Sequence, residues 1–184
     1  MLDRVKRIGW FLANRCFFCL EEEETIDHIL IHCVKTRVLW NFLFSLFGVL
    51  WVLSFSVGDM LLGWHSSFVG KRRKNVWRTA PFCLFWTIWK ERNRRAFKNE
   101  EQSIQHLKCV FLCNLWNWSR LFLSSGPSSI LDFVDWVGSF SGRRSFFLVP
   151  LLLFSLLSGS LYTSCVLQNV VLVLFVHNTC LLYS

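Results

Sequence analysis

The sequence Cys16-Phe17-Phe18-Cys19, followed by His28, His32 and Cys33, contains the residues around which this chain is expected to fold. The spacing is C-x2-C-x8-H-x4-C, or C-x2-C-x8-H-x3-H if His32 takes the place of Cys33. Zn²⁺ binds four thiolate or imidazole ligands in a tetrahedron, and a C-x2-C turn places two thiolates on one side of it. Two pairs of such ligands within 18 residues therefore predict a structural zinc site. The alternative is that the cysteines are small buried hydrophobic residues and the histidines lie on a solvated helix face.

Helix geometry alone does not decide whether His32 or Cys33 is the fourth ligand. From Thr25 the apolar spacing is helical, and residues four apart on a helix are neighbours, which favours pairing of His28 with His32. His28 and Cys33 are five apart, about 140° around an ideal helix, so a site with Cys33 requires the helix to loosen there. A site with four protein ligands leaves no open metal position for catalysis.

Several short motifs of this region resemble those of one family. Asn14-Arg15-Cys16, Ile26-Asp27-His28 and His32-Cys33 are similar to the zinc-binding domain that follows the reverse transcriptase in plant LINE-type (non-LTR) retrotransposon proteins. Further matching motifs, such as Leu62-Gly63-Trp64, continue the resemblance to about residue 138. It implies a truncated copy that lacks the polymerase itself. It also implies Zn as cofactor and a specific ligand set, with His32 as alternative fourth ligand: Cys16, Cys19, His28 and Cys33.

Apolar residues at helical spacing predict a mainly α fold, with a zinc knuckle at 14–34 and a helical remainder to residue 140. A helix over 36–47 is expected to stop at Gly48, whereas 49–56 is either a short strand or a buried connector. Later helices are expected to start at Ser56 and Ser103 and to cover 130–137. The stretch 80–89 is hydrophobic all round, which predicts a buried helix.

Basic residues are concentrated between positions 71 and 98. That segment has ten lysines and arginines against one acid, a net charge of +9, whereas the rest of the chain sums to −1. Such clusters are candidate phosphate contacts for RNA or DNA, and the alternative is that they are the solvated ends of a core helix. No small-molecule substrate is indicated. The candidate nucleic-acid-binding residues are Lys71, Arg72, Arg73, Lys74, Arg78, Lys90, Arg92, Arg94 and Arg95.

No enzyme is visible in the sequence. The chain has 184 residues, too few for a polymerase and its nuclease, and it lacks the paired aspartates that hold polymerase metals. Its eight cysteines come without a signal peptide, which favours a reduced intracellular compartment, nuclear or cytoplasmic. The resemblance implies a non-catalytic, nucleic-acid-associated module of a retrotransposon-derived protein.

The last part of the chain, 141–184, is a hydrophobic tail without Asp, Glu, Lys or Arg after Ser145. One interpretation is a membrane segment, because 146–176 exceeds the roughly 20 residues that cross a bilayer. The chain would then be a tail-anchored protein with a cytosolic zinc-binding, protein-interaction domain. The other interpretation, which the end of the family resemblance favours, is translation into the 3′ flank of the element.

Overall fold

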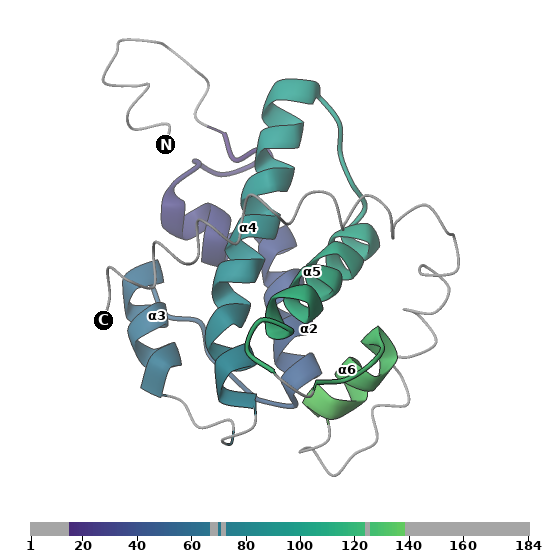
Figure 1. The fold of residues 1–184 in the computed structure, drawn as a ribbon. Coiled ribbons are helices and arrows are strands. Elements are labelled where there is room, and N and C mark those ends of the chain that lie inside the picture. The colour runs from purple at the N-terminus through teal and green to yellow at the C-terminus, as the bar shows by residue number, and fades with distance from the viewer. Residues whose placement is uncertain (1–14, 67–69, 71–72, 124–125, 139–184) are drawn as a thin grey trace.

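The computed structural model describes residues 15–66, 70, 73–123 and 126–138, and within them the fold is mainly α, as predicted (Figure 1). The tail 141–184 and the membrane interpretation of 146–176 lie outside the described residues. No helix in the described part is long and apolar enough to cross a membrane. The helices are η1 (His28–His32), α2 (Val34–Phe47), α3 (Val57–Ser66), α4 (Lys74–Lys98), α5 (Ile104–Ser119) and α6 (Ile130–Gly138).

The long helix α4 is the central element (Figure 1). It packs mainly against α5, and it also contacts α2, α3 and η1. Helix α2 packs against η1, α4, α5 and α6, so it forms the other side of the core. The largest fully buried side chains are aromatic, and most come from α2, α4, α5 and α6. Their large buried area explains how a short chain stabilises this packing of helices. They include Trp40, Phe47, Trp77, Phe111 and Phe133.

The helix ends follow local sequence signals. Gly48 ends α2 in the left-handed conformation (φ 65°), which favours glycine because it has no Cβ, and its N–H donates to the carbonyls of the last turn. Ser103 starts α5, since its side chain accepts a hydrogen bond from the His106 N–H. Ser56 and Asp59 cap the start of α3 through reciprocal hydrogen bonds. These three boundaries match the predictions.

Pro81 lies inside α4 and is compensated by a tryptophan from α3. A proline has no N–H, so Pro81 cannot donate to the carbonyl of Trp77 one turn earlier. Instead, Trp64 Nε1 donates to the Trp77 oxygen at 2.8 Å. The two indole rings are also stacked, with centroids 3.8 Å apart and an interplanar angle of 8°. This pair therefore joins α3 to α4, and its hydrogen bond stands in for the one that Pro81 cannot donate.

Two predictions about burial hold only in part. The segment 49–56 is a connector without strand structure, and it is partly buried: Val49, Trp51 and Leu53 pack against the core, whereas Leu50, Val52 and Phe55 are exposed. The stretch 80–89 is helical but not buried on all sides, since α4 packs against the core with one face only. Phe82 and Trp89 lie on its other face and are exposed. Helix α5, which follows Ser103, ends at Ser119.

Candidate metal centre

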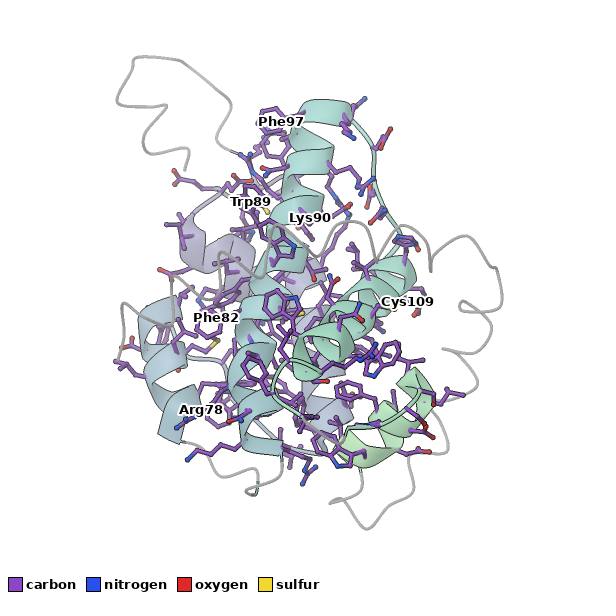
Figure 2. The ribbon with its side chains drawn as sticks, in the orientation of Figure 1. Arg78, Phe82, Trp89, Lys90, Phe97 and Cys109 are labelled. Atoms are coloured by element: carbon purple, nitrogen blue, oxygen red, sulfur yellow. The ribbon has the colours of Figure 1, made fainter. Side chains whose placement is uncertain are left out.

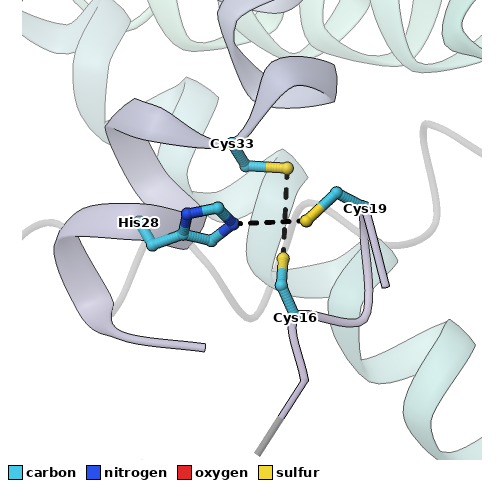
Figure 3. Close-up of side chains that lie close together, drawn as sticks. All are labelled: Cys16, Cys19, His28 and Cys33. Atoms are coloured by element: carbon cyan, nitrogen blue, oxygen red, sulfur yellow. Dashed lines mark hydrogen bonds between the residues drawn. The ribbon is translucent and has the colours of Figure 1, made fainter. Parts of the chain in front are cut away.

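Cys16, Cys19, His28 and Cys33 meet at one point, with their ligand atoms all within 4.8 Å of one another (Figure 3). Cys16 Sγ lies 3.9 Å from Cys33 Sγ, and Cys19 Sγ lies 3.4 Å from His28 Nε2. A tetrahedron with Zn–S bonds of about 2.3 Å and a Zn–N bond of about 2.0 Å has edges of roughly 3.5–3.8 Å. The donor set and its spacing therefore fit Zn²⁺, and all four coordination positions are supplied by the chain.

The short helix η1 brings His28 and Cys33 to the same side. It is a π-helix, in which each hydrogen bond spans five residues, and the Cys33 N–H donates to the His28 carbonyl at 2.7 Å. This wider turn is the loosening that ligation by residues five apart requires. Thr25 fixes the start of the turn, because its Oγ1 accepts from the His28 N–H.

His32 is directed away from the metal site. Its Nε2 lies 2.8 Å from the carbonyl oxygen of Phe55, in the segment before α3. Cys33 instead is fully buried in the cluster with Cys16. The cluster thus has Cys33 as the fourth ligand, as the family resemblance implied, and the alternative with His32 does not fit the structure.

A tight turn holds the first two ligands. The Leu20 N–H donates to the Cys16 carbonyl at 2.8 Å, and Leu20 itself has a positive φ of 65°. The Phe18 N–H points at Cys16 Sγ, 3.4 Å away. Arg15 and Glu23 form an antiparallel bridge that closes this loop. These backbone contacts within residues 15–23 position Cys16 and Cys19 on one side of the site.

Glu22 is a functional residue that the sequence did not single out. One of its carboxylate oxygens lies 3.0 Å from His28 Nδ1. Histidine ligands of zinc commonly donate their second ring N–H to a carboxylate, which fixes the tautomer and the ring orientation. Here the contact leaves Nε2 as the nitrogen that faces the three sulfur atoms. The acidic run 21–24 indicates that a carboxylate is near the site, but its spacing does not show which glutamate contacts the imidazole ring of His28.

The two buried thiols titrate as a pair. The Cys16 thiol donates toward Cys33 Sγ, which lowers the pKa of Cys33 to about 5 against the opposing effect of burial. The backbone N–H groups of Lys35 and Thr36, at the start of α2, lower it further. The same hydrogen bond and burial raise the pKa of Cys16. Zinc binds thiolates, so metal binding at this pair is coupled to proton release.

The knuckle is docked on α4 by arginines. Arg92 donates to Glu24 Oε1 from Nε (3.0 Å) and Nη2 (2.8 Å). Arg95 Nη1 donates to the Phe18 carbonyl at 3.2 Å, and its guanidinium carbon lies 4.6 Å from the centroid of the Phe18 ring. Glu91, which is buried, accepts from Arg95 Nε at 2.8 Å. Part of the basic cluster is therefore used inside the protein.

The structure places the candidate phosphate-binding residues in different environments. Arg73, Arg92 and Arg95 point into the protein: Arg73 donates to the Val137 carbonyl, and burial lowers its pKa. Arg94 is partly exposed and lies within 3.6 Å of Glu100. Lys74 is exposed, and Arg78 and Lys90 are partly exposed on the outer side of α4. Lys71 and Arg72 lie outside the described residues.

Three thiols and one imidazole, closed around one point and supported by a carboxylate, define a structural zinc-binding domain rather than a catalytic metal site. The family model described as zinc-binding in reverse transcriptase matches residues 1–40, which include all four ligands. Residues 1–40 are thus a zinc-binding domain of the retrotransposon reverse-transcriptase type, as the sequence motifs predicted. Beyond this domain no polymerase or other catalytic domain is identified. No curated protein and no solved structure matches the chain.

Proposed function

We propose that this protein is a non-catalytic module that binds RNA or DNA and is built on a zinc-stabilised knuckle. The observation that carries the proposal is the docking of the four-ligand site onto the cationic helix α4 through Glu24 and Arg92. A closed site of this kind supplies stability instead of a reactive water. Zinc, when bound, cross-links the knuckle and so fixes one end of α4. An intracellular location, nuclear or cytoplasmic, is part of the proposal because the ligand thiols must stay reduced.

Charge supports a nucleic-acid partner. The acidic residue of α4, Glu91, is buried against the core, where it pairs with Arg94 (3.5 Å) and Arg95 (2.8 Å). The outer side of this helix therefore carries cations and no exposed acid of α4. Lysine and arginine on a phosphate backbone read charge and not base identity, so we expect binding with little sequence preference. The residues proposed for these contacts are Lys74, Arg78, Lys90 and Arg94.

Salt-dependent binding of the full chain, loaded with zinc, to single-stranded RNA and DNA tests the proposal. For three to four phosphate contacts, log affinity should fall with log salt at a slope of roughly −2 to −3, at about 0.7 per contact. The variant K74A/R78A/K90A should flatten this slope. The matched control R37A/K108A/R120A removes three cations outside α4 and should keep it. An intact chain that binds neither nucleic acid at low salt would contradict the proposal.

A further inference from the structure

Aromatic side chains form a row along the outer face of α4 (Figure 2). Phe82, Trp89 and Phe97 are 52%, 43% and 79% exposed, and they follow one another at seven- and eight-residue intervals, two helical turns apart. Trp86 lies between the first two and is half-buried. This row, hereafter the aromatic row, is therefore Phe82, Trp86, Trp89 and Phe97.

Phe82, Trp89 and Phe97 of the aromatic row are exposed and lie outside the core, whereas Trp86 is partly buried and packs against it. The core-facing residues of α4 lie on the opposite side of the helix and include Leu84, Ile88 and Glu91. Single exposed apolar residues are common on protein surfaces, but an aligned set of large aromatic rings marks an interaction site. The row extends over about 22 Å from Phe82 to Phe97 at 1.5 Å per residue. It therefore offers several stacking surfaces in series.

Two details indicate a partner with both planar and anionic groups. The Trp86 and Trp89 rings are stacked, with centroids 5.2 Å apart and an interplanar angle of 19°, and Lys90 Nζ lies 5.9 Å from the Trp86 ring centroid. Lys74 and Lys98 are exposed at the two ends of the same helix. Aromatic rings alternating with cations are what a nucleic-acid strand with unpaired bases requires, because its bases stack on the rings and its phosphates pair with the cations.

From this geometry we infer that the aromatic row is the binding platform for single-stranded nucleic acid, with unpaired bases stacked on Phe82, Trp89 and Phe97. The inference rests on the proposed function and specifies its substrate as single strands, since the base faces of a duplex are hidden in its own stack. Trp89 also lines an apolar pocket together with Ile26, Ile29 and Leu30, which belong to the zinc knuckle. The zinc knuckle thus adjoins the middle of the platform.

The test compares two fluorescent probes of about 12 nucleotides, a length within the range of single-strand sites: oligouridine, and an abasic strand with the same backbone. The full, zinc-loaded chain should bind oligouridine at least about thirtyfold more tightly than the abasic strand. The variant F82A/W89A/F97A should lose this preference and keep its affinity for the abasic strand. The matched control F55A/L62A/F122A removes three exposed apolar side chains outside α4 and should behave like the original chain.

Crosslinking of the unaltered chain gives a readout that does not depend on the folding of a variant. Photocrosslinking with 5-iodouridine should place adducts on the aromatic row, and adducts confined to other helices would overturn the inference. Equal binding of the two probes by the original chain, or an unchanged preference in F82A/W89A/F97A, would overturn it while the proposed function stands. If the original chain forms a dimer, and F82A/W89A/F97A is monomeric but binds both probes with unchanged affinity, the aromatic row is a contact surface for a second copy of the chain and the inference is overturned. Absence of any binding would overturn both proposals.

Discussion

Arg92 on α4 donates two hydrogen bonds to one carboxylate oxygen of Glu24, a residue 68 positions earlier in the zinc knuckle. Both side chains are nearly buried, at 11% and 7% exposure, and the second Glu24 oxygen accepts from the Phe17 N–H at 3.2 Å. A buried charge of this kind is stable only while its partner is present. The knuckle and the helical part are therefore expected to fold as one unit.

This coupling predicts non-additive stability effects. Glu24→Ala and Arg92→Ala should each lower the free energy of unfolding by about 3 kcal/mol, because each leaves a buried charge unpaired. The double variant should lose much less than the sum of the two. Urea denaturation of the zinc-loaded chain measures these values. As a control, Lys35→Ala breaks the more exposed pair with Glu101 and should cost at most about 1 kcal/mol. Additive losses at Glu24 and Arg92 would refute the coupling.

Zinc content should identify the ligands. The purified chain is expected to contain about one zinc ion, measured by elemental analysis, and Cys16→Ser or Cys33→Ser should abolish its retention because a structural site needs all four ligands. His32→Ala should retain the metal, since His32 Nε2 is directed at the Phe55 carbonyl. Chelation of the metal should unfold the knuckle. Loss of zinc in His32→Ala with retention in Cys33→Ser would reverse the ligand assignment.

Glu22 should tune the affinity of the site. Glu22→Gln removes the carboxylate that faces His28 Nδ1, and changes of this type typically weaken metal binding by about 10- to 100-fold. Competition with a chromogenic chelator measures the effect. Glu21→Gln is the matched control, because Glu21 is an exposed neighbour in the same acidic run. Equal affinities of the two variants would show that the contact with His28 has no influence on the metal.

The effects of substitutions at Trp64 and Pro81 on the free energy of unfolding should depend on each other. Trp64→Phe keeps an aromatic ring but removes the hydrogen bond to the buried Trp77 carbonyl, at a cost of about 1–3 kcal/mol in unfolding free energy. Pro81→Ala restores a backbone N–H at the position that normally donates to this carbonyl. Denaturation of the single and double variants tests the relation. Trp64→Phe should be less harmful when combined with Pro81→Ala, and an equal loss in both backgrounds would contradict it.

Ligand spacing and helical periodicity predicted the zinc site and most helices, because both are local properties of the sequence. The roles of Arg92 and Arg95 were not predictable in this way. Their partners Glu24 and Phe18 are some 70 residues away, and a basic run looks the same whether it faces solvent or a buried glutamate. The exposure of Trp89 was also missed. A stretch that is apolar on all sides carries no periodic signal to show which face meets the core.

The π-turn between His28 and Cys33 relates ligand spacing to backbone geometry. With four intervening residues the chain needs a turn closed over five positions, as in η1. With three intervening residues, an ordinary α-turn would bring both ligands to one side. Deletion of one residue, such as Leu30, should therefore be tolerated better by the metal site than replacement of either ligand. In variants of this knuckle, the number of residues between the third and fourth ligands would then indicate the kind of turn: four residues a π-turn and three residues an α-turn.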